Sequence, residues 1–162
     1  MRHPSPVTGN WQPAAGNQQL ALYTGEVHPD WKAAASTGDT ARLQELLESG
    51  ADINARDDHG QTAVMIAARD GRTPTVRFLI EKGADLNATA KFNLSALMLA
   101  VINGRDAIVG ILADAGADRG IRGTGAPGFD GKTALDIAVA GQRTIMVALL
   151  QQPDSATSAT RH

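Results

Sequence analysis

The fold is decided by residues 60–87, which read GQTAVMIAARDGRTPTVRFLIEKGADLN. Two short apolar patterns, one around Val64 and one around Val76, are separated by turn-forming residues, and this arrangement predicts a helix, a turn and a second helix. Pro74 is expected at the first position of the second helix, where its missing N–H costs nothing. Gly83 follows the second apolar pattern, where a left-handed backbone ends a helix. The stretch therefore predicts a helical hairpin.

The tripeptide near the end of this stretch recurs at a fixed interval. Gly-Ala-Asp begins at Gly50, Gly83 and Gly116, so both intervals, 83 − 50 and 116 − 83, are 33 residues. Alanines keep the same register sixteen residues before these glycines, at Ala34, Ala67 and Ala100. A fixed period of this length predicts stacked units, because one helical hairpin cannot bury its apolar face alone.

Hydroxyl residues stand just before the first apolar run of three units, at Thr62, Ser95 and Thr133. At the N-terminus of a helix, a hydroxyl can accept a hydrogen bond from a backbone N–H that has no partner within the helix. Thr133 and Asp136, three residues apart, also fit a capping box. The glycines of the repeated tripeptide are expected to end the second helices with a left-handed backbone, at Gly50, Gly83 and Gly116.

These features give the chain a resemblance to a known family. Residues 60–71, followed by Val76, Leu79 and the closing residues 83–87, resemble the ankyrin repeat. Further segments are similar to other copies, namely residues 93–120, residues 131–152 and, with Trp31 in a core position, residues 29–56. The resemblance implies an all-α ankyrin-repeat solenoid of about four helix–turn–helix units joined by hairpin loops.

The predicted organisation has an N-terminal extension, a repeat domain and a disordered C-terminal tail, at residues 1–26, 27–152 and 153–162. The extension is expected to be partly disordered or to pack on the first repeat through Trp11 and residues 20–23. The repeats are expected at about residues 29–56, 57–88, 89–120 and 121–152.

Three departures from the family pattern carry predictions. The usual Thr-Pro-Leu-His motif is replaced, for example by Thr62-Ala63-Val64-Met65, so the array is expected to be less stable than an idealised one. The interval from Asn93 to Gly131 is 38 residues where that from Gly60 to Asn93 is 33, which places an insertion in a glycine-rich loop at residues 119–130. The last copy ends in Gln151-Gln152-Pro153, which predicts a polar terminal cap.

The composition excludes several classes of function. Lys and Arg number 15 against 17 Asp and Glu, and a net charge of −2 gives no attraction to nucleic acid. The absence of cysteine excludes disulfides, thiolate metal sites and cysteine nucleophiles. No apolar run has the length of a signal peptide or a membrane span, so a soluble protein is expected, cytoplasmic unless a signal peptide has already been removed. The surface composition gives no sign of self-association, so a monomer is expected by default.

Two motifs could indicate chemistry. Residues 126–133 satisfy a relaxed phosphate-loop pattern, but no buried strand precedes them, as that loop requires. Asp57-Asp58-His59 could suggest a metal site or an acid–base pair, but its place in a hairpin favours solvent-exposed residues. No catalytic constellation is found, so we expect a protein that is not an enzyme and holds no metal or cofactor.

The resemblance instead implies a protein–protein interaction module, acting as adaptor, scaffold or inhibitor, that binds a protein on its concave face and hairpin tips. Phe92 and Leu94, with Phe129 one repeat away, are expected to form an apolar hot spot flanked by basic residues, unless Phe92 folds back on its own repeat. An alternative function is nucleotide or small-molecule binding through the glycine-rich residues 122–133. The predicted partner-binding residues are Asp58, His59, Gln61, Arg69, Asp70, Lys91, Phe92, Leu94, Ile102, Asn103, Arg122, Phe129 and Lys132.

Overall fold

The computed structural model describes residues 28–153. This part of the chain folds into eight α-helices, which form four consecutive pairs. It also contains one short 3-10 turn, η2 (Lys91–Asn93). We refer to the pairs as units one to four. They are α2 (Pro29–Thr37) with α3 (Thr40–Glu48), α4 (Ala63–Asp70) with α5 (Thr73–Glu81), α6 (Ala96–Ile102) with α7 (Asp106–Asp114), and α8 (Ala134–Ala140) with α9 (Thr144–Gln151).

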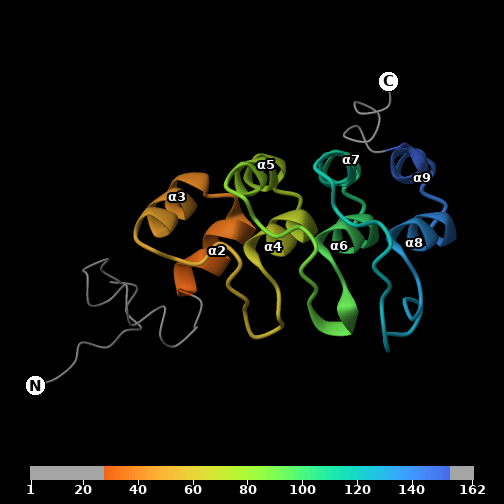
Figure 1. Ribbon diagram of the computed structural model, residues 1–162, viewed down its shortest axis with the longest axis horizontal. Coiled ribbons are helices and arrows are strands. Elements are labelled where there is room, and N and C mark those ends of the chain that lie inside the picture. Colours follow the sequence, from red (N-terminus) through yellow and green to blue (C-terminus); the bar gives the residue numbers. More distant parts are fainter. Residues whose placement is uncertain (1–27, 154–162) are drawn as a thin grey trace, which may run out of the picture.

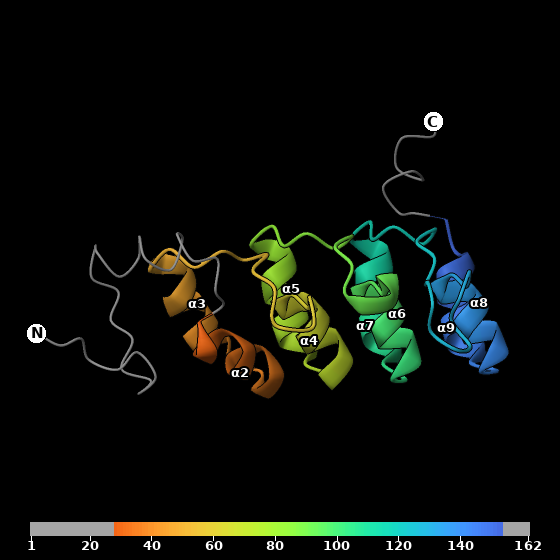
Figure 2. The ribbon, with the colours of Figure 1, turned by 90° about the horizontal axis from the view of Figure 1, so that it is seen from below.

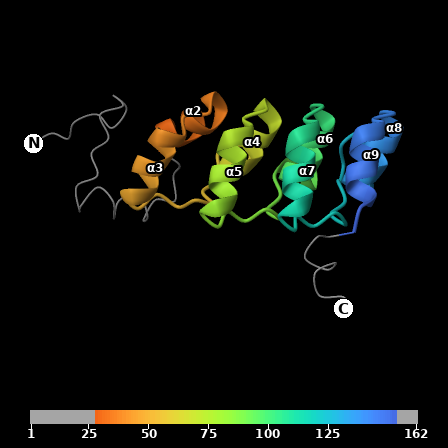
Figure 3. The same ribbon diagram turned by 90° about the horizontal axis from the view of Figure 1, so that it is seen from above.

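The four units stand side by side in one row. The first helices α2, α4, α6 and α8 form one layer and the second helices α3, α5, α7 and α9 form the other (Figure 1). Views from below and from above show the same order along the row (Figures 2 and 3). Hairpin loops project from the layer of first helices. The described residues contain isolated β-bridges but no β-strand. The all-α repeat stack predicted from the period is confirmed.

Glycines end the helices as the sequence predicts. Gly50, Gly83 and Gly116 follow the second helices with φ of 101°, 86° and 92°, a left-handed backbone that side chains with a Cβ rarely adopt. Pro74 differs by one position, because α5 begins at Thr73. Proline is still tolerated there, since the first-turn N–H groups of a helix have no partner within it.

The three predicted hydroxyl caps have different outcomes. Ser95 Oγ accepts a hydrogen bond from Met98 N at 3.3 Å. Thr133 and Asp136 form the capping box, with Asp136 N donating to Thr133 Oγ1 at 3.2 Å and Thr133 N donating to Asp136 Oδ2 at 3.0 Å. The prediction for Thr62 is wrong: its hydroxyl is buried and accepts no bond from the first turn of α4. In this position burial in the packed core has prevailed over capping.

One core runs through all four units. Each first helix contacts the first helix of the next unit, and α5, α7 and α9 contact one another in sequence. Small residues allow the first helices to approach closely, and they are fully buried at Ala63, Ala67, Ala96, Ala100, Ala134 and Ala138. Larger apolar side chains fill the space between the layers, among them Trp31, Leu43, Leu79, Leu112 and Met146.

Two series of hydrogen bonds link neighbouring units. The arginines before α5, α7 and α9 each donate to a carbonyl of the preceding unit: Arg72 Nε to Ser36 O at 2.6 Å, Arg105 Nε to Arg69 O at 3.1 Å and Arg143 Nη2 to Ile102 O at 3.4 Å. Asparagines on the opposite edge accept from the next unit: Asn54 from Asp85 N at 2.8 Å and Asn87 from Asp118 N at 2.7 Å. These bonds satisfy backbone groups that would otherwise have no partner within their own unit.

Two predictions concern the ends of the chain. The N-terminal extension, including Trp11 and residues 20–23, lies outside the described residues, as does all but Pro153 of the C-terminal tail. Within residues 28–153, no helix has the length and apolar character needed to cross a membrane.

Candidate functional site

The predicted partner-binding residues lie along the hairpins and the C-terminal ends of α4 and α6. We call these thirteen residues the candidate surface. None is fully buried. The exposed members are Asp58, His59, Lys91, Phe92, Asn103, Arg122 and Lys132. The half-buried members are Gln61, Arg69, Asp70, Leu94, Ile102 and Phe129.

A polar network occupies the part of the candidate surface that unit two contributes. Arg69 pairs with Asp70 through Nε–Oδ1 at 2.7 Å and Nη2–Oδ2 at 3.0 Å, and its Nη1 donates to Gln61 Oε1 at 2.8 Å. Ser36 Oγ, on α2, donates to Asp70 Oδ2 at 2.6 Å. These side chains therefore hold one another in place and connect units one and two.

The charge of Asp70 makes this network dependent on pH. Hydrogen bonds from Arg69, the larger cause, and from Ser36 hold the pKa of Asp70 below its usual value of 3.8, although burial opposes the shift. A carboxyl whose pKa is lowered by folding stabilises the folded state above the unfolded pKa, and this contribution is lost as the pH falls through the folded pKa.

We therefore expect Asp70→Asn to lower the free energy of unfolding by about 1 kcal/mol at neutral pH. Asp70 becomes protonated at low pH and then, like Asn, carries no charge. The difference in unfolding free energy between the variant and wild type should therefore shrink as the pH falls below about 4. Urea unfolding followed by circular dichroism at several pH values measures this. An equal difference at neutral and strongly acidic pH would show that the carboxylate charge is not what matters.

Unit three contributes apolar side chains to the candidate surface, next to the polar Lys91 and Asn103. The Phe92 side chain is 50% exposed, and Ile102 is half-buried at the end of α6. Leu94 packs against the core from the hairpin, so it supports the surface more than it projects from it. Phe92 is not part of the core packing, in contrast to the alternative in which it folds back on its own repeat.

The turn that carries Phe92 is strained. Phe92 and Asn93 have φ of 59° and 55°, and Leu94 N donates to Lys91 O at 3.3 Å, the arrangement of a type I′ turn. A left-handed backbone is unfavourable for a bulky aromatic residue and persists only where neighbours hold it. Here Thr124 N donates to Phe92 O at 2.8 Å, and Asn93 Nδ2 donates to Arg122 O at 2.9 Å. The loop of unit four thus fixes the turn of unit three.

The loop of unit four folds back on itself without helix, as predicted for the insertion. Gly123 N donates to Lys132 O and Gly131 N donates to Gly123 O, both at 2.9 Å. Asp130 Oδ1 accepts from Gly125 N at 2.8 Å, and Arg122 Nη1 donates to Gly131 O at 2.6 Å. These bonds give the inserted residues a defined conformation.

Comparison with protein families agrees with this geometry. The family model described as ankyrin repeats matches residues 31–123 as three copies, which is more than half of the chain. The chain belongs to the ankyrin-repeat family. Among curated proteins, no match was found. The pair α8 and α9 lies beyond the matched residues and continues the same stack in the structure.

The ankyrin stack provides no phosphate loop at residues 126–133. The loop follows other loop residues, whereas a phosphate loop connects a buried strand to a helix. At the start of α8, the carboxylate of Asp136 accepts from Thr133 N. Nothing in this arrangement supports the alternative of nucleotide binding.

The cluster at Asp57-Asp58-His59 has a structural role in the first ankyrin hairpin. Asp57 Oδ1 accepts from His59 N at 2.9 Å and from Gln61 N at 2.8 Å, and Asp57 Oδ2 lies 3.4 Å from Lys32 Nζ. The aspartate therefore closes the turn and links it to α2. In residues 28–153, no group of three His, Cys, Asp or Glu side chains is arranged to hold a metal ion.

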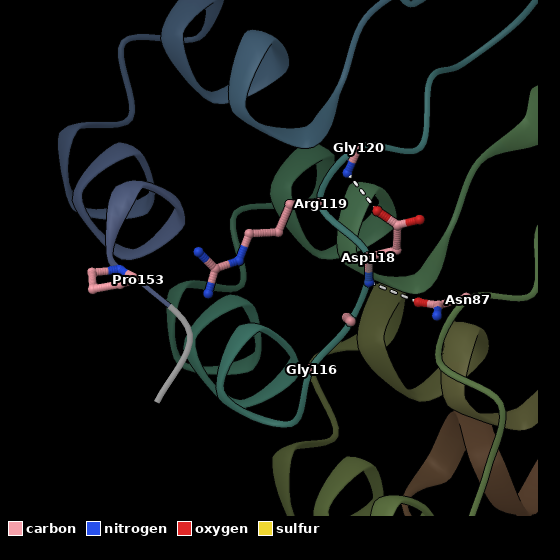
Figure 4. A pocket seen from close by; sticks show the side chains of 7 residues that line it. Asn87, Gly116, Asp118, Arg119, Gly120 and Pro153 are labelled. Atoms are coloured by element: carbon pink, nitrogen blue, oxygen red, sulfur yellow. Dashed lines mark hydrogen bonds between the residues drawn. The ribbon is translucent and has the colours of Figure 1, made fainter. Parts of the chain in front are cut away.

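A shallow hollow of about 640 Å³, which the sequence did not predict, lies beside the ends of the second helices (Figure 4). Asn87, Asp118, Arg119 and Pro153 line it. Its polar groups already link units: Asn87 accepts from Asp118 N, and Arg119 Nη1 donates to Leu150 O at 3.2 Å. The lining therefore serves the ankyrin stack and presents no convergent set of free ligand-binding groups.

Proposed function

We propose that this chain binds a protein partner through the candidate surface and acts as an adaptor, scaffold or inhibitor. Ankyrin repeats are in general protein–protein interaction modules, and the family is typically not enzymatic. The observation that carries the proposal is Phe92, a half-exposed aromatic residue on a strained hairpin turn that forms hydrogen bonds with the neighbouring loop.

The mechanism that we propose is anchoring by a pre-organised apolar residue. Aromatic side chains supply a large part of the energy of many interfaces, most of all when they are rigid before binding. The bond from Thr124 N to Phe92 O fixes the backbone of Phe92, and the bond from Asn93 Nδ2 to Arg122 O fixes the next residue of the turn. A partner that covers the Phe92 side chain therefore loses little entropy in ordering the turn. Ile102 extends the apolar area on the same unit.

The charges around this anchor favour an acidic partner segment. Lys91, Arg122 and Lys132 are exposed on the hairpin of unit three and the loop of unit four. The Arg122 guanidinium is already held near its own loop, with Nη1 3.9 Å from Asp136 Oδ2. We therefore expect the two lysines to contribute most, mainly to the rate of association and to its dependence on salt.

Polar contacts with the unit-two part of the candidate surface would set the specificity for the partner. The network of Gln61, Arg69 and Asp70 presents fixed donors and acceptors on unit two, and a partner must match them because leaving one unpaired on burial is costly. Asp58 and His59 add exposed polar groups at the hairpin tip. The proposed partner segment is thus apolar and acidic over units three and four and polar over unit two.

The experiment begins with capture of partners by the full chain and their identification by mass spectrometry, followed by affinity measurement by calorimetry. Phe92→Ala is expected to weaken binding of the identified partner by roughly 2 kcal/mol, about 30-fold in Kd, with an unchanged circular dichroism spectrum.

Ile145→Ala is the matched control, because Ile145 is 61% exposed and lies on α9, away from the candidate surface. Its affinity should equal that of wild type. If Phe92→Ala binds as tightly as wild type while both remain helical, the proposed anchor is wrong.

A further inference from the structure

The turn that joins α6 to α7 contains a reactive pair of residues. Asn103 follows the last residue of α6, and Gly104 comes next with a left-handed φ of 72°. Both residues are exposed. In the sequence, Asn103 is the only asparagine that precedes a glycine. The turn therefore combines an accessible side-chain amide with a following backbone nitrogen that has no side chain beside it.

An Asn-Gly pair reacts within its own chain. The backbone nitrogen of the glycine loses its proton and attacks Cγ of the asparagine, and the side-chain nitrogen leaves as ammonia. A five-membered succinimide ring remains, and water opens it at either carbonyl to give aspartate or isoaspartate. Glycine favours ring closure, because it has no Cβ to hinder the attack and its backbone rotates freely. The reaction consumes only water.

The other asparagines of the described stack are less suited to this reaction. Asn54 and Asn87 precede alanines, and the side-chain oxygen of each accepts a hydrogen bond from a backbone N–H of the next unit. Asn93 precedes Leu94, whose side chain hinders the approach of the backbone nitrogen. Asn103 has neither obstacle.

Two Asp-Gly pairs, at Asp70-Gly71 and Asp130-Gly131, share the glycine but not the amide. A carboxylate already carries negative charge and so resists attack by an anionic nitrogen. Hydrogen bonds from Arg69 and Ser36 hold the pKa of Asp70 below its usual value, so this side chain stays ionised. Asp70 occupies in unit two the position that Asn103 occupies in unit three, and only in unit three does the pair carry a neutral, reactive amide.

Two hydrogen bonds restrain the Asn103 turn. Gly104 N donates to Val101 O at 3.1 Å, and Asn103 Nδ2 donates to Leu99 O at 2.8 Å. Both must open before the nitrogen reaches Cγ. They lie at the exposed end of a seven-residue helix, and helix ends open locally at a lower free energy than the rest of a fold. The restraint therefore slows the reaction and does not prevent it.

A cation lies over the attacking group. The guanidinium of Arg143, in unit four, is so close to Gly104 that a Cβ built on this glycine would be 2.9 Å from Arg143 Nη1. A nearby positive charge favours the deprotonated form of an ionisable group. Arg143 therefore stabilises the anionic backbone nitrogen that attacks the asparagine.

We propose that Asn103-Gly104 is a site of spontaneous deamidation, which converts a neutral amide on the candidate surface into a carboxylate. The product loses the donor that bonds Leu99 O. It also places a negative charge at the C-terminus of α6, where the helix dipole disfavours it. The modified chain should therefore have a looser end of α6. If the partner segment is acidic, as the proposed function holds, the new charge also repels it.

Incubation of the full chain at physiological temperature, followed by digestion with trypsin at mildly acidic pH and tandem mass spectrometry, tests the proposal. Cleavage after Lys91 and after Arg105 gives one peptide that contains both Asn93 and Asn103, so each digest has an internal reference. We expect conversion at Asn103 to grow with time, to yield both aspartate and isoaspartate, and to be faster at higher pH. No conversion at Asn103, or conversion no faster than at Asn93, overturns the proposal.

Gly104→Ala is the matched variant, because the added methyl group hinders ring closure. Its conversion at Asn103 should be slower than in wild type. Alanine is unfavourable at a φ of 72°, so the turn of the variant opens more often, which by itself would speed the reaction. Slower conversion in a chain with a helical circular dichroism spectrum supports attack by this nitrogen, and equal or faster conversion contradicts it. The comparison of Asn103 with Asn93 in wild type decides the question if the variant does not fold.

The effect of the modification is measured with Asn103→Asp, which reproduces one product, and Asn103→Gln, which keeps a neutral amide. The aspartate variant should unfold at a lower urea concentration than the glutamine variant. Equal midpoints would show that the new charge does not loosen α6. Conversion at Asn103 is measured without any partner, so this proposal and the proposed function fail independently.

Discussion

Leu112→Ala is expected to lower the free energy of unfolding by about 4 kcal/mol. Leu112 lies on α7, is 0% exposed and belongs to the continuous core. Replacing a buried leucine with alanine costs the lost apolar burial and the cavity left behind, about 2 to 5 kcal/mol. Unit three contacts both unit two and unit four, so a weaker unit three also weakens the coupling between the two sides of the stack. Chemical denaturation followed by circular dichroism measures the change.

The control is a truncation of similar volume at an exposed position. Ile145→Ala removes a similar volume at a 61% exposed position and should change the free energy of unfolding by less than about 0.5 kcal/mol. Two separate unfolding transitions in Leu112→Ala would show that units on either side of the substitution have become independent. A loss smaller than about 1 kcal/mol would mean that the core is not packed around Leu112 as described.

The repeat architecture could be predicted from the sequence because its physical requirements leave marks at fixed positions. The second helices of units one to three end in a left-handed turn that favours glycine, so Gly50, Gly83 and Gly116 reveal the period directly. Each first helix must approach its neighbour closely, so small residues recur in register with those glycines, as at Ala67 and Ala100. The period therefore follows from local backbone and packing needs.

Details that depend on competition between neighbours could not be predicted in this way. Thr62 has the sequence context of a helix cap, but its side chain is enclosed in the core and makes no capping bond. Arg69, Asp70 and Gln61 were predicted as separate contact residues, yet they form one network with Ser36 of the preceding unit. Such networks depend on rotamers and on distances between units, which a one-dimensional pattern does not contain.

Phe92 and Val139 show which part of a residue's environment the sequence does not reveal. Phe92 could be found as a large apolar residue on a hairpin, but a left-handed turn is not typical of Phe-Asn. This turn is held by contacts that the sequence does not reveal, among them the bonds with the unit-four loop. Val139 has the type of residue expected for a buried stacking position, and its exposure follows only from its place at the end of the described stack. In both cases the residue type was visible in the sequence and its environment was not.

Gly123→Ala is expected to destabilise the protein by about 3 kcal/mol, because the loop of unit four has no room for a side chain at this position. A Cβ on Gly123 would lie 2.6 Å from the carbonyl oxygen of Phe129, closer than non-bonded atoms approach. The contact is with the backbone, so rotation of a side chain cannot relieve it. Gly123 is also buried and bonded through both its N–H and its carbonyl, to Lys132 O and from Gly131 N. Overpacking at such a site costs about 1 to 3 kcal/mol, and we expect the upper end because backbone must move.

Gly110→Ala is the matched control and should act in the opposite direction. Gly110 lies within α7, and a Cβ there would meet Leu149 Cδ2 at 3.6 Å, an ordinary contact, so the substitution should stabilise the protein by about 0.5 to 1 kcal/mol. Hydrogen exchange then locates the effect of Gly123→Ala: the amides of Gly123, Gly131 and Thr124 should exchange faster. Because Thr124 N holds the carbonyl of Phe92, the same variant should also loosen the hairpin of unit three. If Gly123→Ala is as stable as wild type, the loop adapts at no cost and cannot be what holds Phe92 in its strained conformation.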